Sequence, residues 1–132
     1  MMATDDLFTG DRLTIVRTVS KQLVSLLWKG ECDFPSPAET LGPTLNGLIS
    51  ELRDRKLVMD FSGLRFMNSS SVTPILGFVK AACSKGIPVH LIYSSRMSWQ
   101  RTMASSMRAL VHALKHLSVE LQTSDAVHRD SD

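Results

Sequence analysis

The segment 57–71 reads LVMDFSGLRFMNSSS and decides the fold. Its first five residues form a short apolar run of the kind that is buried in a parallel sheet. A turn through Ser62 and Gly63 follows, and a short link leads to Asn68 and three serines. Such side chains accept hydrogen bonds from the N–H groups at the start of a helix. The segment therefore predicts a strand, a link and a helix that begins at residues 68–71.

Strands and helices alternate on both sides of this segment. Strands are expected at residues 12–19, 23–28, 57–61, 87–92 and 118–121, and helices at 37–52, 69–85 and 97–115. This order implies right-handed crossovers. We therefore expect an α/β fold with a mostly parallel, four- to five-stranded sheet and helices packed against it. The strand at 12–19 is expected at an edge of this sheet.

The first helix has a complete start signal. Ser36 stands at the N-cap, Pro37 at the first helical position and Glu39 at the third. Gly42 and Pro43 follow within the helix, and proline both lacks a donor and crowds the preceding turn. We expect a kink or a short break there.

One domain is expected from 132 residues of ordinary composition. Residues 1–11 are polar and acidic and predict a flexible arm, residues 12–122 a single domain, and residues 123–132 a disordered tail. No stretch has the features of a signal peptide or reaches the length of a membrane span. The protein is therefore expected in the cytoplasm, without membrane contact.

The net charge of +2, from 15 basic and 13 acidic residues, is too small for a general nucleic-acid binder. Cys32 and Cys83 are far apart and predict reduced thiols. His112 and His116 have the spacing of a metal pair but lack a third ligand, so ordinary surface histidines are expected. The chain contains no GxSxG, Walker or GxGxxG motif. Neither an enzyme nor a cofactor is predicted.

The functional surface of such a sheet usually lies beyond the carboxyl ends of its strands, where residues 66–71 fall. A hydroxyl at a helix N-terminus is exposed, and a phosphate on it would meet the positive end of the helix dipole. The simpler interpretation is that these residues only cap the helix. Both interpretations place Ser69 and Ser70 at the start of the helix.

The segment 57–70 resembles the central motif of STAS domains, the fold of the anti-sigma factor antagonists. The earlier stretch 28–34, WKGECDF, is similar to the entry of that family into its first helix. This sequence has Asn68 where the family usually has Asp, and Ser71 where it has Gly, which fits a divergent branch.

The resemblance implies a bacterial, non-catalytic signalling module that is switched by phosphorylation. Ser69 matches the phosphorylated serine, with Ser70 beside it. The implied partners are a serine kinase of the anti-sigma factor type, a PP2C-type phosphatase or another regulatory protein. The residues expected to contact the partner are Phe66, Met67, Asn68, Ser71, Thr73, Tyr93 and Ser94. The edge strand also allows a homodimer.

An alternative from another class is a module that binds a nucleotide or another phosphate-bearing ligand at the same helix N-terminus. The sheet topology permits this function, and the sequence does not decide between the two.

Overall fold

The computed structural model describes residues 2–123. They form one seven-stranded sheet, three α-helices and a short 3-10 helix, η1. In chain order the elements are β1 (Ala3–Thr9), β2 (Leu13–Val19), β3 (Leu23–Cys32), α1 (Pro37–Leu48), η1 (Ile49–Leu52), β4 (Lys56–Asp60), β5 (Leu64–Met67), α2 (Ser69–Ser84), β6 (Val89–Ser94), α3 (Ser98–Leu110) and β7 (Leu117–Gln122). The predicted α/β class is confirmed, with more strands than expected.

The sheet is mixed but mostly parallel. Its strand order is β1-β2-β3-β4-β6-β7, and β5 pairs with β3 outside this path. β1, β2 and β3 are antiparallel neighbours, whereas the pairings of β3 with β4 and β5, of β4 with β6, and of β6 with β7 are parallel. The carboxyl ends of β4 and β6 therefore meet at one end of the sheet, as the alternating sequence predicted.

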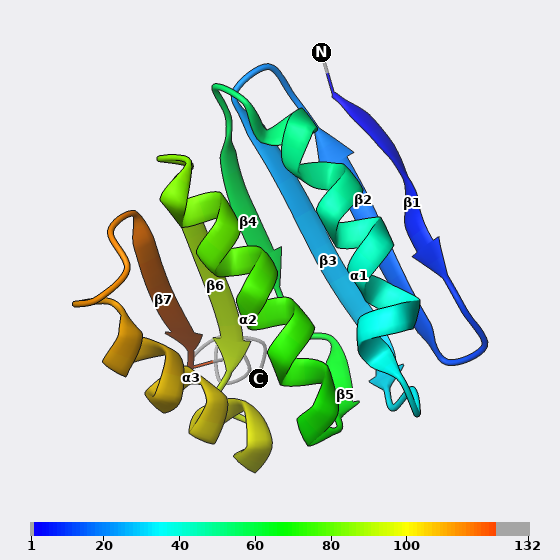
Figure 1. Ribbon diagram of the computed structural model, residues 1–132. Coiled ribbons are helices and arrows are strands. Elements are labelled where there is room, and N and C mark those ends of the chain that lie inside the picture. The colour runs from blue at the N-terminus through cyan, green and yellow to red at the C-terminus, as the bar shows by residue number, and fades with distance from the viewer. Residues whose placement is uncertain (1, 124–132) are drawn as a thin grey trace, which may run out of the picture.

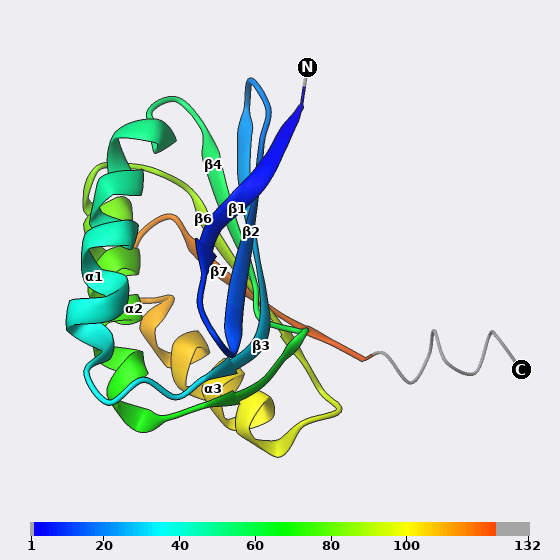
Figure 2. The ribbon, with the colours of Figure 1, turned by 90° about the vertical axis from the view of Figure 1, so that its right-hand side faces the viewer.

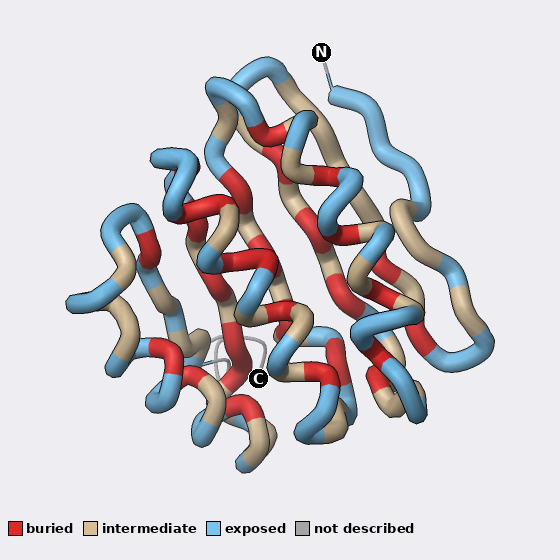
Figure 3. Tube along the Cα trace, in the orientation of Figure 1, coloured by how far each residue is buried: buried red, intermediate tan, exposed pale blue. Residues whose placement is uncertain are grey.

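All three helices lie on one face of the sheet (Figures 1 and 2). Strand residues such as Leu26, Met59 and Leu91 point toward them and are almost fully buried. Figure 3 shows this alternation as buried positions along the central strands. Each large apolar side chain buried in this way stabilises the fold by roughly 1.5–3 kcal/mol. The core therefore lies between one face of the sheet and the helices.

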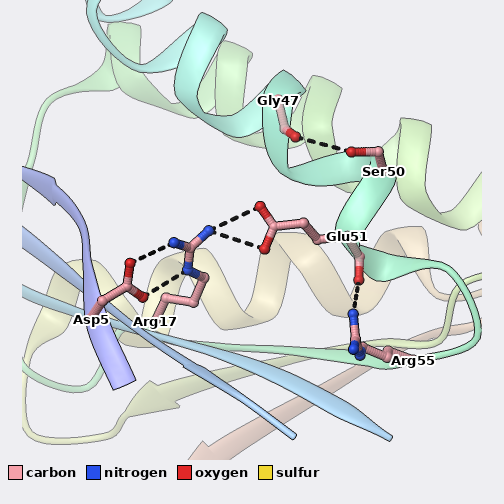
Figure 4. A network of polar contacts seen from close by, with 6 residues as sticks. All are labelled: Asp5, Arg17, Gly47, Ser50, Glu51 and Arg55. Atoms are coloured by element: carbon pink, nitrogen blue, oxygen red, sulfur yellow. Dashed lines mark hydrogen bonds and ion pairs between the residues drawn. The ribbon is translucent and has the colours of Figure 1, made fainter. Parts of the chain in front are cut away.

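The N-terminal segment differs from the prediction. Residues 3–9, which we expected in a flexible arm, form β1 and take the edge position that we expected for the strand at 12–19. The side chain of Arg17 on β2 pairs with Asp5 on β1 and with Glu51 in η1 (Figure 4). Phe8 also packs edge-on against Phe34, with 5.7 Å between the ring centres. These long-range contacts order a segment whose own composition is polar.

β5 is a second strand that the sequence did not predict, because its residues follow a turn and half of them are exposed. It pairs with the last residues of β3, beyond the point where β3 leaves β4. Gly30 lies at this change of partner with φ of +98°. A Cβ atom there would lie 2.0 Å from the carbonyl oxygen of Arg12, the residue before β2. The close approach of β3 to the start of β2 therefore requires glycine.

Two helices also differ from the prediction. α1 runs through Pro43 without a break, with the proline ring at an exposed position. α3 ends at Leu110 instead of 115, and turns replace its expected last part. His116, just before β7, has φ of +76°, which a helix does not allow. Thr123 follows β7, and the rest of the predicted tail lies outside the described residues.

Candidate functional site

The start of α2 is fixed by Asn68. Its backbone is extended, and its Oδ1 accepts a hydrogen bond from the N–H of Ser71 at 3.2 Å. Its Nδ2 donates to the carbonyl oxygen of Phe34 at 3.0 Å, and its backbone N–H donates to the carbonyl oxygen of Cys32 at 2.9 Å. Asn68 therefore caps the helix, as predicted, and also ties the helix to the end of β3. An aspartate would lack the donor to Phe34, which gives Asn at this position a physical reason.

Ser69 and Ser70 are exposed in the first turn of α2. Thr73 is exposed one turn later. Ser71, which we expected to contact a partner, is instead fully buried. Its hydroxyl donates to Asn68 Oδ1 and accepts from the thiol of Cys32 at 3.3 Å. The physical reason is the helical turn, which directs residue 71 inward while residues 69 and 70 face outward.

Phe66 on β5 lies just before this helix and is 47% exposed. An exposed ring of this size is uncommon on the described surface, where the other large apolar side chain of comparable exposure is Met2. Met67 is half-buried. The expectation that Phe66 is accessible to a partner therefore agrees with its position.

Tyr93 and Ser94 do not lie on the surface where we expected them. Tyr93 is 1% exposed and stacks on Phe61, with 5.2 Å between the ring centres. Burial raises the pKa of its hydroxyl above the ordinary value. Ser94 is 4% exposed, and its hydroxyl accepts a hydrogen bond from the N–H of Arg96 at 3.1 Å. The sequence predicted both residues in a loop after the strand at 87–92, whereas β6 extends to Ser94 and Gln100 of α3 binds its end.

Gln100 is a residue that sequence reasoning missed. It is fully buried in the first turn of α3. Its Oε1 accepts from the N–H of Ser94 at 2.7 Å, and its Nε2 donates to the carbonyl oxygens of Phe61 and Leu64, each at 2.8 Å. Gln100 thus joins the ends of β4 and β6 to the start of β5. No signal in the sequence identifies it, because a glutamine on a helix is ordinarily expected to be exposed.

A hollow of about 330 Å³ lies between the first turns of α2 and α3. Apolar side chains and hydroxyl groups line it, from Met67, Ser69, Val72, Ser98, Trp99, Thr102, Met103 and Ser106. The indole N–H of Trp99 donates to the carbonyl oxygen of Arg65 at 3.0 Å, which fixes the ring against β5. None of these lining residues in the described chain carries a charge, so the hollow suits an apolar or neutral side chain.

The remaining candidates lie elsewhere. Cys32 and Cys83 are buried free thiols, and burial raises the pKa of both. His112 and His116 are exposed. Residues 2–123 contain no cluster of three or more side chains suited to hold a metal ion. No helix among them is long and apolar enough to cross a membrane.

A serine, a histidine and a glutamate meet on the sheet face away from the helices. His90 Nδ1 lies 2.7 Å from Ser118 Oγ, and His90 Nε2 lies 2.9 Å from Glu120 Oε1. The hydrogen bond with His90 lowers the pKa of Glu120. These residue types occur in hydrolytic triads. Here they are cross-strand neighbours on β6 and β7, and none of the three lines the hollow between α2 and α3.

Comparison with protein-family models and with curated protein sequences gives no match. Solved structures do match. An anti-sigma factor antagonist from Mycobacterium paratuberculosis aligns with a TM-score of 0.61 and 14% identity, over 94% of this chain and 98% of the other. The unphosphorylated form of the anti-sigma factor antagonist SpoIIAA aligns with a TM-score of 0.53 and 16% identity, over 98% and 96% of the two chains.

A third match is a chain from the complex of the diguanylate cyclase SiaD with its activator SiaC from Pseudomonas aeruginosa. It has a TM-score of 0.57 and 20% identity, and the alignment covers 87% of this chain and 98% of the other. These likenesses show that the chain has a STAS-like fold, as the motif at 57–70 predicted.

Proposed function

We propose that this chain, whose fold is that of the anti-sigma factor antagonists, is a signalling module that binds a regulatory protein. Its docking surface is formed by Phe66, Ser69, Ser70 and Thr73. The observation that carries the proposal is the exposed ring of Phe66 beside two exposed serines at the start of α2. Aromatic side chains are enriched where proteins dock, because they bury a large area with few rotatable bonds.

The hollow between α2 and α3 supports the same function. It borders Ser69, and its lining is apolar and neutral. A neutral side chain of a partner could enter it, whereas a phosphate-bearing ligand would find no basic side chain among the lining residues. The hollow therefore favours a protein partner over the small anionic ligand that the sequence left as an alternative.

Phosphorylation of Ser69 is the proposed switch. A phosphate would add about −1.5 to −2 charges at the edge of the hollow, while the N-terminus of α2 would tolerate the anion. Ser69 makes no side-chain hydrogen bond within the described residues, so its hydroxyl is available to a kinase. The added charge would oppose the entry of an apolar partner group without unfolding the domain.

The neighbours in the structure comparison agree with a protein partner. Two of them are anti-sigma factor antagonists, and the third comes from a complex of an enzyme with its activator. We propose a serine kinase, a phosphatase or another regulator as the partner here. The module itself is proposed to be non-catalytic.

The test is quantitative recovery of partners from the native cell by the wild type and by variants. Ser69→Asp should lower the recovery of a specific regulator by about tenfold or more, which corresponds to about 1.4 kcal/mol of binding free energy. Ser69→Ala should retain the regulator. Ser105→Asp is the matched control, because Ser105 is exposed on α3 and does not line the hollow. Intact-mass measurement of the wild-type protein should show one phosphate that Ser69→Ala lacks.

Full binding by Ser69→Asp, or an equal loss in Ser105→Asp, would contradict the switch. Binding that is unchanged in Phe66→Ala would contradict the docking surface itself.

A further inference from the structure

A second candidate surface lies at the opposite end of the sheet, at the amino ends of β4 and β6. A hollow of about 940 Å³ opens there between η1, the link to β4 and the link from α2 to β6. Its size falls within the range of roughly 300–1,000 Å³ that is typical of small-molecule sites. Its lining residues come from the end of the molecule where α1 and α2 finish, opposite the start of α2 (Figure 1).

Basic side chains dominate this hollow. Arg53, Lys56 and Lys85 line it and are exposed, and none of them forms an ion pair or a side-chain hydrogen bond within residues 2–123. Asp54 is the acidic residue among the lining positions that the structure describes. A second hollow shares Gly86 with the first and adds Lys80 and Lys115. A chain with a net charge of only +2 thus concentrates positive charge at one end.

Two other charged side chains nearby, those of Arg55 and Glu51, are already engaged (Figure 4). Arg55 donates to the carbonyl oxygens of Ser20, at 3.0 Å, and Glu51, at 2.7 Å. The carboxylate of Glu51 accepts two hydrogen bonds from Arg17, at 3.0 and 3.1 Å. Glu51 is therefore held toward β2, and it does not neutralise the exposed cations of the hollow.

Helix capping does not account for the exposed cation of Lys85, the C-cap residue of α2. Basic residues often neutralise the carbonyl groups at the end of a helix. At the end of α2, however, backbone N–H groups already bind those carbonyls. Lys85 and Ile87 donate to Ala82, and Gly86 donates to Cys83, at 2.9–3.1 Å. Gly86 has φ of +79°, the conformation that closes helices in this way.

The hollow also has an apolar wall. Ile87 is 6% exposed and Ile49 is half-buried, and Asn46 offers an amide at the rim.

We propose that this hollow binds a nucleoside polyphosphate. The phosphates contact Arg53, Lys56 and Lys85, and the base packs on the half-buried Ile49. Arg53 suits this role because its guanidinium binds two phosphate oxygens at once. The site is independent of the docking surface, because its residues come from the other end of α2.

Isothermal titration of the full chain at low ionic strength tests this proposal, with ATP, GTP and pyrophosphate as separate probes. We expect a nucleotide to bind more tightly than pyrophosphate. The double variant Arg53→Gln/Lys85→Gln should weaken nucleotide binding by about tenfold or more, since it removes two charge-assisted hydrogen bonds to the phosphates. The matched control Arg108→Gln/Lys29→Gln removes the same charge from exposed positions outside this hollow and should bind normally.

Ile49→Ala separates the contribution of the base from that of the phosphates. It should weaken ATP or GTP while pyrophosphate binding stays unchanged. Absence of nucleotide binding at millimolar concentration would overturn the proposal. Equal losses in the two double variants, or pyrophosphate that binds as tightly as both nucleotides, would indicate general anion attraction and would also overturn it.

Discussion

The two ends of the sheet are built in different ways. At the carboxyl end of the parallel strands, the side chains of Asn68 and Gln100 are turned inward and hold the links by hydrogen bonds to the backbone. At the amino end, the backbone itself closes α2, and basic side chains stay exposed. The first arrangement fixes the shape of a neutral surface, as docking to one protein requires. The second leaves charge available for a small anion.

The largest expected effect at the carboxyl end is that of Gly30→Ala. The new Cβ would lie 2.0 Å from the Arg12 carbonyl oxygen, at a positive φ. We expect a loss of about 3 kcal/mol or more in the free energy of unfolding in urea, because the backbone must shift. Gly77→Ala is the control, since nothing lies within 4 Å of its added Cβ. It should stabilise α2 by about 0.5–1 kcal/mol. A harmless Gly30→Ala would contradict the close strand approach.

Gln100→Leu comes next. The substitution keeps an apolar volume but leaves the Ser94 N–H and two carbonyl oxygens without this partner. We expect a loss of about 2–4 kcal/mol and faster amide exchange at Ser94. Gln22→Leu, at an exposed position near the amino end, should change stability by less than about 0.5 kcal/mol. Similar effects of the two substitutions would remove the contrast between the ends.

Asn68→Ala should have a smaller effect, about 1–2 kcal/mol, because it removes the cap of α2 and the bond to Phe34. Asn68→Asp should cost less, since it keeps the acceptor at the helix N-terminus and loses only the donor. Thermal unfolding of the two variants separates these contributions. If Asn68→Asp were the more harmful of the two, repulsion from the Phe34 carbonyl would outweigh the retained cap.

The smallest expected effect lies outside both ends, on the edge strand β1. The hydrogen bond from Arg17 lowers the pKa of Asp5 in the folded chain. Its stabilising effect is therefore present above the pKa of the unfolded state and is lost as the pH falls through the lower, folded value. Asp5 is exposed, so the loss in Asp5→Asn at neutral pH should stay below about 0.5 kcal/mol. The difference in Tm between wild type and variant should close in acid, and a difference that grew there would contradict this sign.

Local patterns in the sequence were enough to predict the helix starts at Ser36 and Asn68, the buried strand at 57–61 and the α/β class. The patterns failed where distant residues decide the outcome. β1 is ordered by contacts with Arg17 and Phe34. β5 pairs with the end of β3, where the register shifts after Gly30. The residues in each of these contacts are too far apart in the sequence for a local pattern to include both. Periodicity also predicted the apolar stripe of α3. It could not identify Gln100 as a buried residue that joins the ends of β4 and β6 to the start of β5.

For the candidate site, Phe66, Ser69 and Ser70 are exposed, as docking of a partner would require, and their role in docking stays a prediction. The motif did not separate outward from inward side chains, because Ser71, Tyr93 and Ser94 are close in sequence to exposed positions and are nevertheless buried. The basic hollow was not predicted, since Arg53 and Lys56 are separated from Lys85 in the sequence by most of β4, by β5 and by the whole of α2.

The positions of the two tryptophans give the chain a built-in optical readout. Trp28 is fully buried beside Phe61, with 5.1 Å between the ring centres, so its emission should shift to the red only when the core opens. Trp99 is half-buried in the wall of the hollow beside Ser69, so the quenching of its fluorescence should change when a side chain of a partner enters the hollow. Replacing either indole with phenylalanine leaves a single fluorophore, and docking and unfolding can then be followed separately without any added label.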